Sequence, residues 1–232
     1  YGHGQRVAVL LDNRAEFFLH FQALNSLGVS VVPVNTGFLD EEMSYVIDHS
    51  DSCLIVSLPV YIEKVKRALQ KVDRPVQISD TGGMDALPPA TEKVLEREPD
   101  SETEAAVLYT SGTTGEPKGC MISNDYFVTM GLWYTSITGY CQLEYGEERM
   151  LTPLPLVHMN ALCTMMAMIM SGGCIIQLDR FHASNWWETV RASKATCLHY
   201  LGVIPAILLN QAEQDDDNVG DQVKFGFGAG VD

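Results

Sequence analysis

The chain alternates short, continuously apolar runs with longer segments in which apolar residues recur every three or four positions. Residues 6–11 read Arg-Val-Ala-Val-Leu-Leu, which suits a strand covered on both faces, and residues 14–27 carry helical spacing. The pair repeats as a strand over 29–34 and a helix over 40–48. Because parallel strands need a crossover connection, this alternation predicts an α/β fold with a mostly parallel sheet.

An irregular segment interrupts this alternation near the middle of the chain. Residues 79–101 contain Gly-Gly and Pro-Pro pairs and scattered charges without periodicity, which favours a loop or linker. We therefore predict two fused subdomains with mostly parallel sheets flanked by helices, residues 1–100 and 101–232. Further strands are expected at 53–57, 105–109, 150–152, 174–178, 196–200 and 223–227, and further helices at 60–72, 124–136, 160–170, 185–193 and 204–211.

Charge and hydropathy exclude several classes of protein. With 15 Lys and Arg against 30 Asp and Glu, the chain lacks the basic stripe that a nucleic-acid or anionic membrane surface needs. The most apolar run, residues 161–170, is far shorter than the ~20 residues of a membrane span, so it predicts a buried helix. No signal-peptide pattern opens the chain, and we expect a cytoplasmic enzyme. The six cysteines show no metal-ligand spacing, so no metal site is predicted.

Residues 109–119 carry the clearest chemical signal, Tyr-Thr-Ser-Gly-Thr-Thr-Gly-Glu-Pro-Lys-Gly. Glycines let main-chain amides approach an anion, hydroxyls donate hydrogen bonds, and a lysine adds a positive charge. A phosphate-binding loop after the strand at 105–109 is therefore predicted, with a plain flexible connector as the alternative. The lysine is followed by Gly119 rather than Ser or Thr, which argues against a Walker loop.

This segment resembles the signature loop of adenylate-forming enzymes, which include acyl-CoA synthetases, peptide-synthetase adenylation domains and luciferases. Residues 28–35 and 40–43 resemble an upstream segment of the same enzymes, and the resemblance covers essentially the whole chain. It implies a fold like the N-terminal domain of acyl-CoA synthetases. It also implies the use of ATP, Mg²⁺ and coenzyme A: a carboxylic acid becomes an acyl-adenylate with release of pyrophosphate and is then transferred to coenzyme A.

Residue roles follow from the resemblance by matching position. The loop residues implied to hold ATP are Thr110, Ser111, Gly112, Thr113, Thr114, Gly115 and Lys118, and Lys118 and Thr113 are assigned to catalysis. Gly228, Ala229 and Gly230 are implied to lie beside adenine and the acyl carbonyl. A plain turn is the competing interpretation of that glycine-rich end.

Two further segments are implied to bind the acid. Residues 153–160, Pro-Leu-Pro-Leu-Val-His-Met-Asn, resemble the Pro-Leu-x-His segment at the acyl pocket of acyl-CoA synthetases, which points to His158 and Asn160. Residues 199–202 end a predicted strand where the family places part of the same pocket, which points to Tyr200 and Gly202. A structural histidine and ordinary strand-end packing of the tyrosine are the alternatives.

Several family motifs are missing from the sequence, among them the aromatic-Gly-x-Thr-Glu run and the C-terminal domain with its adenylation lysine. We therefore expect a partial N-terminal domain, truncated at both ends, that alone turns over little or no acid. The preferred function is acyl-CoA ligase chemistry on a small or medium carboxylic acid. An adenylation domain that loads a carrier protein and a non-catalytic nucleotide-binding module are the alternatives.

Overall fold

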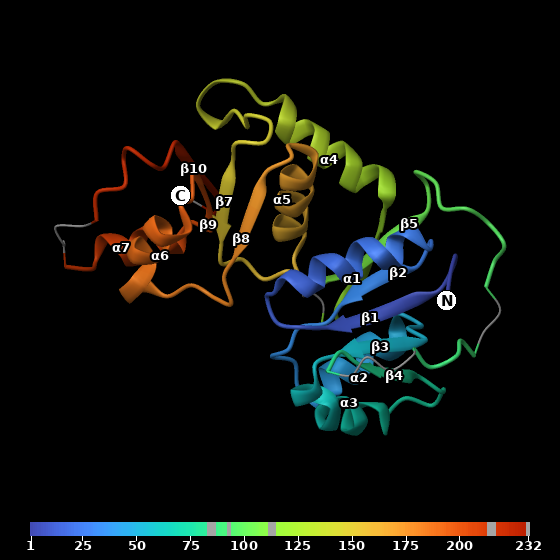
Figure 1. Cartoon of the computed structure of the whole chain (residues 1–232). Coiled ribbons are helices and arrows are strands. Elements are labelled where there is room, and N and C mark those ends of the chain that lie inside the picture. Colours follow the sequence, from blue (N-terminus) through green and yellow to red (C-terminus); the bar gives the residue numbers. More distant parts are fainter. Residues whose placement is uncertain (83–86, 92–93, 111–114, 213–216, 231–232) are drawn as a thin grey trace. The chain divides into compact units, whose positions relative to one another are not determined.

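The computed structural model describes residues 1–82, 87–91, 94–110, 115–212 and 217–230. Contacts within the chain divide it into two compact units, Tyr1–Tyr126 and Phe127–Asp232 (Figure 1). Each unit is built on its own sheet, and each is described by itself.

A six-stranded sheet in the order β4-β3-β1-β2-β5-β6 forms the centre of the first unit. Five strands are paired in parallel, and β6 runs antiparallel to β5. The sequence-based boundary at residue 100 placed β5 in the second subdomain, but β5 pairs with β2 and so belongs to the first sheet. The strands are β1 (Arg6–Leu10), β2 (Ser30–Pro33), β3 (Leu54–Ser57), β4 (Gln77–Asp80), β5 (Glu104–Thr110) and β6 (Lys118–Ser123).

Helices cover both faces of this sheet (Figure 1). Helix α1 (Ala15–Ser26) connects β1 to β2, α2 (Asp40–His49) connects β2 to β3, and α3 (Ile62–Leu69) follows a 3₁₀ turn at Pro59–Tyr61. Strands β2 and β3 flank β1 on opposite sides, so right-handed crossovers place α1 and α2 on opposite faces.

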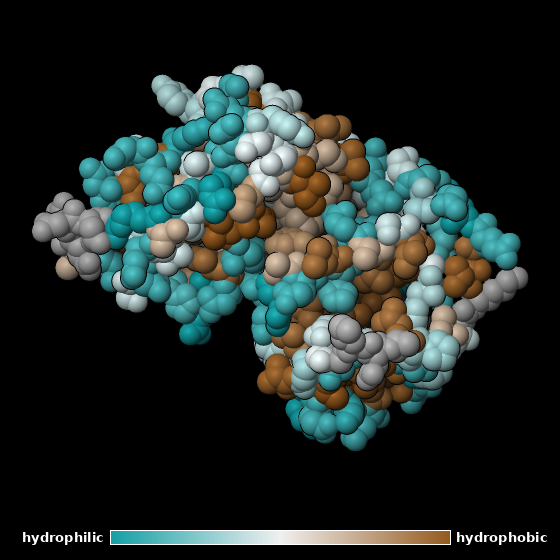
Figure 2. Space-filling model, viewed as in Figure 1, coloured by the Kyte–Doolittle hydropathy of each residue, from teal (hydrophilic) through white to brown (hydrophobic). Residues whose placement is uncertain are grey.

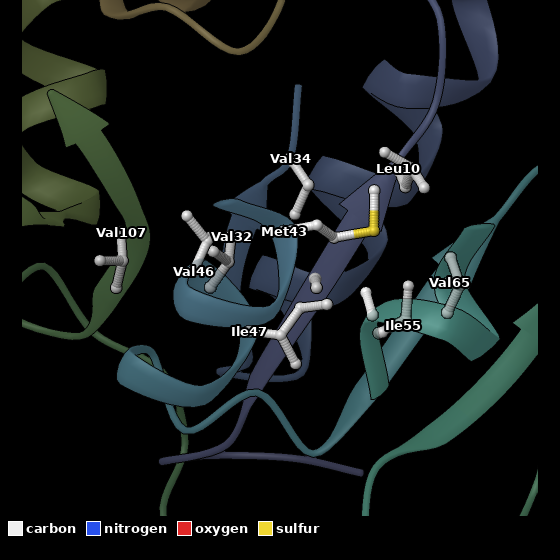
Figure 3. Packing of buried hydrophobic residues seen from close by; sticks show 11 residues of the cluster. Leu10, Val32, Val34, Met43, Val46, Ile47, Ile55, Val65 and Val107 are labelled. Atoms are coloured by element: carbon white, nitrogen blue, oxygen red, sulfur yellow. The ribbon is translucent and has the colours of Figure 1, made fainter. Parts of the chain in front are cut away.

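The core beneath α2 explains why this helix holds a fixed position on the sheet. Met43, Val46 and Ile47 recur at helical spacing and are fully buried. Figure 3 shows their side chains reaching toward Val32 and Ile55 of the sheet, within one cluster. Burying side chains of this size contributes about 1.5–3 kcal/mol each, so α2 is firmly docked.

A four-stranded sheet, parallel throughout and in the order β10-β9-β7-β8, organises the second unit. Its strands are β7 (Arg149–Thr152), β8 (Cys174–Gln177), β9 (Cys197–Leu201) and β10 (Phe225–Ala229). The helices are α4 (Asn124–Ser136), α5 (Met159–Met170), α6 (Trp186–Ser193) and α7 (Val203–Leu209), with 3₁₀ turns at Gly139–Cys141 and Ala183–Asn185. The structure thus confirms the predicted α/β class with mostly parallel sheets.

Helix α5 is the buried helix that the apolar run predicts. Residues 161–168 are all buried, and only Ile169 near the end is half exposed. Ala167 and Met168 pack with Met150 on one face of the sheet, whereas Trp186 of α6 packs on the other face. The sheet of the second unit is therefore also covered on both sides.

Helix α3 is strongly amphipathic. Val65 and Ala68 of α3 face the core, and hydrophilic residues cover the surface over this helix at the lower end of Figure 2. Among the described residues, no helix combines the length and the apolar character that crossing a membrane requires.

Candidate functional site

The predicted phosphate-binding loop is the connection of a β-hairpin. Tyr109 pairs with Gly119 and Thr110 pairs with Lys118 in the antiparallel ladder between β5 and β6. Because β5 is parallel to β2, its carboxyl end lies at the sheet edge where ligands bind in open α/β folds. The sequence predicted a strand, a loop and then a helix, and it missed strand β6.

The structure describes both ends of this loop. Thr110 and Lys118 have exposed side chains, and the Lys118 ammonium has no ion-pair partner among the described residues. Gly115 has φ of +119°, a backbone conformation that side chains disfavour, which explains the glycine there. The other predicted ATP-binding residues, Ser111, Gly112, Thr113 and Thr114, lie outside the described residues.

The remaining predicted site residues gather at one edge of the second sheet. His158 and Asn160 lie where β7 leads into α5, and Tyr200 and Gly202 lie where β9 leads into α7. Residues 228–230 end β10. Since β7, β9 and β10 are parallel neighbours, their carboxyl ends bring these three segments together. The predicted residues therefore form two groups, one in each unit.

A buried histidine that the sequence did not single out connects two of these segments. His199 of β9 is fully buried, and its Nε2 lies 3.1 Å from Oδ1 of Asn160. Its Nδ1 lies 3.2 Å from the Thr152 hydroxyl and 3.1 Å from the Thr164 hydroxyl. With the Asn160 oxygen as acceptor, Nε2 carries the proton and Nδ1 accepts from a hydroxyl. His199 thereby fixes the start of α5 against β9.

The surroundings of His199 keep its imidazole neutral. Burial lowers its pKa from 6.5 to about 4, because a charged ring would lose its hydration. Its hydrogen-bonding and ring neighbours among the described residues are uncharged: two threonine hydroxyls, the Asn160 amide, and the Phe227 ring at a centroid distance of 4.8 Å. At neutral pH this residue is a hydrogen-bonding partner rather than a charge.

Tyr200 lies on the opposite face of the sheet from His199, because successive strand residues alternate. Its ring packs over β10, where a Cβ on Gly226 would lie 2.9 Å from Tyr200 Cε1. It lines an apolar cavity of about 630 Å³ together with Trp187 and Leu208. The structure therefore does not bring Tyr200 together with Asn160, although both follow the same sheet edge.

Gly228 has a packing reason to be glycine. A Cβ there would lie 2.4 Å from the backbone oxygen of Tyr200, which is too close for any relaxed structure. Gly230 has φ of +71° and open space around a Cβ, as a turn would require. The side chain of Ala229 lies outside the described residues. Close packing against β9 and a turn conformation are therefore sufficient to explain the two glycines, whether or not a ligand binds beside them.

Replacing Gly228 with alanine is expected to destabilise the second unit by about 1–3 kcal/mol, because the new methyl group meets the β9 backbone. Gly226→Ala is the matched control: its Cβ meets the edge of the Tyr200 ring, which can shift. All three tryptophans, Trp133, Trp186 and Trp187, lie in this unit, so urea unfolding followed by tryptophan fluorescence reports on it. An equal or larger loss in Gly226→Ala would contradict the packing interpretation.

His158 and Gly202 complete the predicted set. His158 precedes the first turn of α5 in an extended conformation, its side chain is exposed, and it forms no capping hydrogen bond. Gly202 is half-buried before α7. The backbone of His158 is held by hydrogen bonds to Pro155 and Leu162, so its exposed side chain is the part of the residue that is available to a ligand.

Each unit is built on a mostly parallel sheet, and a glycine- and threonine-rich loop follows the carboxyl end of β5, an arrangement that is typical of nucleotide-binding α/β proteins. The chain belongs to the AMP-binding enzyme family, which matches residues 1–230. The family resemblance drawn from the loop is therefore confirmed.

The chain is similar to proteins that act on different acids. It is 31% identical over 214 residues to the long-chain-fatty-acid–CoA ligase FadD13 of Mycobacterium tuberculosis, covering 88% of this chain and 40% of that protein. It is 32% identical over 216 residues to a sulfoacetate–CoA ligase of Cupriavidus necator, covering 90% and 42%. The o-succinylbenzoate CoA synthetase of Bacillus subtilis, solved with its acyl-adenylate intermediate, superposes with a TM-score of 0.76 at 25% identity, covering 99% and 57%. The chain thus spans about two fifths of the length of these curated relatives.

Proposed function

We propose that this chain is the nucleotide-binding part of an ATP-dependent acid–CoA ligase. The observation that carries the proposal is the Gly/Ser/Thr/Lys hairpin at the carboxyl edge of a parallel sheet, in a chain of the AMP-binding family. The relatives support it, because the two curated ones are named as CoA ligases and the solved one holds an acyl-adenylate.

In the first step, a carboxylate oxygen of the acid attacks the α-phosphorus of ATP. The bond from that phosphorus to the bridging oxygen breaks, and pyrophosphate leaves with the negative charge. Lys118 and the Thr113 hydroxyl are the groups we assign to this charge, since fixed donors stabilise a developing anion strongly. Thr110, Ser111, Gly112, Thr114 and Gly115 would hold the remaining phosphate oxygens. Mg²⁺ would enter with the nucleotide substrate, because phosphates usually supply several of its ligands.

In the second step, the thiol sulfur of coenzyme A attacks the acyl carbonyl carbon. The carbon–oxygen bond to AMP breaks, and the thiol proton is released. His158, Asn160, Tyr200 and Gly202 are proposed to contact the acid, and Gly228, Ala229 and Gly230 to lie beside the adenylate. A small or medium carboxylic acid is the proposed substrate class.

The test is acid-dependent exchange of pyrophosphate into ATP by the complete protein, over a panel of carboxylic acids. Exchange with at least one acid, followed by thioester formation on free coenzyme A, is expected. Transfer only to a carrier protein would favour the adenylation-domain alternative, and nucleotide binding without exchange for any acid would favour a non-catalytic module.

The isolated chain provides a second test of the same proposal. We expect it to release little or no pyrophosphate, because it spans only about two fifths of the length of the curated CoA ligases that it matches. Clear turnover by the 232-residue chain would show that this part of the relatives' length is sufficient for the first step.

A further inference from the structure

Helix α2 contacts both ends of the phosphate-binding hairpin through two side chains one helical turn apart. The Tyr45 hydroxyl donates a hydrogen bond to the Pro117 carbonyl oxygen at 2.9 Å. His49 Nδ1 lies 2.8 Å from the Tyr109 hydroxyl. Tyr109 precedes the loop and Pro117 ends it, so one helix holds the entry and the exit of the same loop.

The three rings involved pack together. Tyr45 and His49 are stacked with centroids 5.2 Å apart, and Tyr109 meets them edge-on at 6.4 and 5.7 Å. Aromatic pairs in such geometry contribute beyond simple burial. Burial also raises the pKa of Tyr109 to about 12, so its hydroxyl stays protonated at neutral pH.

The contact with Pro117 bears directly on Lys118. Proline has no backbone N–H, so the carbonyl is its one hydrogen-bonding group on the main chain. That carbonyl belongs to the peptide plane joining Pro117 to Lys118. A bond from Tyr45 therefore fixes the orientation of the peptide from which the Lys118 side chain departs.

Gly119 makes room for this arrangement. A Cβ at Gly119 would lie 2.9 Å from Val107 Cγ1 and 3.2 Å from Tyr109 Cζ. Glycine at this position thus lets the Tyr109 ring lie across β6 on its way to α2. Since α2 is itself anchored in the core through Met43, the clamp has a rigid base.

We propose that Tyr45, His49 and Tyr109 form an aromatic clamp that pre-organises the phosphate-binding hairpin, with Tyr45 as a positioning residue for Lys118. The proposal rests on the proposed function, because it assumes that the hairpin binds nucleotide phosphates. A loop held in its binding geometry loses less conformational freedom when the ligand arrives, which raises affinity.

The test compares Tyr45→Phe and Tyr45→Leu with Tyr61→Phe. Tyr61 is a matched control, because its hydroxyl donates to Asp12 at 2.6 Å in the same unit, and none of its hydrogen bonds in the described part of the chain reaches residues 115–123. Two quantities are measured: amide hydrogen exchange of residues 118–120, and ATP affinity together with KM for ATP and kcat in the complete protein. Losing one neutral hydrogen bond corresponds to a factor of about 3–10.

Tyr45→Phe is expected to speed amide exchange at 118–120 about 3–10-fold and to weaken ATP binding by a similar factor, with kcat less affected. Tyr45→Leu, which also removes the ring, should exceed both effects, and Tyr61→Phe should show neither. If Tyr45→Leu does not fold, Tyr45→Phe decides the outcome.

Wild-type exchange and wild-type ATP affinity in Tyr45→Phe would overturn the clamp while leaving the proposed function intact. Faster exchange confined to the hairpin, in a protein that binds no ATP, would support the clamp and refute the proposed function. The two ideas can therefore fail separately.

Discussion

Replacing Lys118 with alanine in the complete protein is expected to lower acid-dependent pyrophosphate release by about 10²–10³-fold. The ammonium lies at the end of the hairpin, exposed and without an ion-pair partner among the described residues, so it is free to meet phosphate charge. Charge that develops on departing pyrophosphate is stabilised by fixed donors, and removing one such donor typically costs this factor in kcat. Initial rates over a range of ATP concentrations at saturating acid give kcat and KM and so measure the effect.

Lys66→Ala is the control for this substitution. Lys66 is an exposed lysine of the same unit that pairs with Glu63 at 2.7 Å, far from the hairpin in sequence, and its loss should leave the rate unchanged. A fall in kcat for Lys118→Ala would assign the lysine to the transition state. A rise in KM for ATP alone would assign it to ground-state binding, and an unchanged rate would remove Lys118 from the chemistry.

Elements with an apolar run could be predicted from the sequence, including the edge strands β8 and β10 of the second sheet, whereas the edge strands β4 and β6 of the first sheet could not. Strand β1 and helix α5 are buried along most of their length, so their residues carry an unbroken hydrophobic signal. Strand β6 is an edge strand whose Met121 is 68% exposed, and β4 is a short edge strand without a buried residue. With solvent on one side, such strands need no apolar run and leave no pattern.

The division of the chain depended on a contact that is distant in sequence. The irregular segment at 79–101 has the composition of a linker, yet the strand after it returns to pair with β2. The pairing of β2 with β5, in which Val31 lies opposite Ala106, depends on the fold as a whole. The local composition of the segment between these strands does not predict this pairing. A loop of this composition marks an irregular connection, without showing which sheet the chain joins next.

The candidate site, too, could be predicted from the sequence only in part. Sequence position placed Asn160 and Tyr200 at strand ends, and parallel pairing brought those ends to one edge as expected. Which face of the sheet each side chain occupies depends on the strand's neighbours, and this separates Tyr200 from Asn160 while joining Asn160 to His199. His199 directly precedes Tyr200 in the sequence. Only the packing of α5 against one face of the sheet shows that His199, and not Tyr200, contacts Asn160.

Acidification from pH 7 to pH 4 is expected to destabilise the second unit by up to about 3 kcal/mol through His199 alone. The imidazole has a pKa of 6.5 in the unfolded chain and about 4 in the folded one. Between these values the unfolded state binds a proton that the folded state does not. Stability is therefore complete above pH 6.5, falls as the pH drops through that value, and levels off below pH 4.

His199→Gln isolates this contribution, because glutamine keeps an amide donor and acceptor but does not titrate. The variant should be less stable than wild type at pH 7, since the bonds to Asn160 and Thr152 are imperfectly replaced. Its unfolding free energy, followed by tryptophan fluorescence in urea, should then fall by about 3 kcal/mol less than that of wild type between pH 7 and pH 4. Suppose instead that the unfolding free energy depends on pH in the same way in wild type and His199→Gln. The folded imidazole would then accept a proton as readily as the unfolded one, and the interpretation of His199 as a neutral hydrogen-bonding residue between α5 and β9 would be wrong.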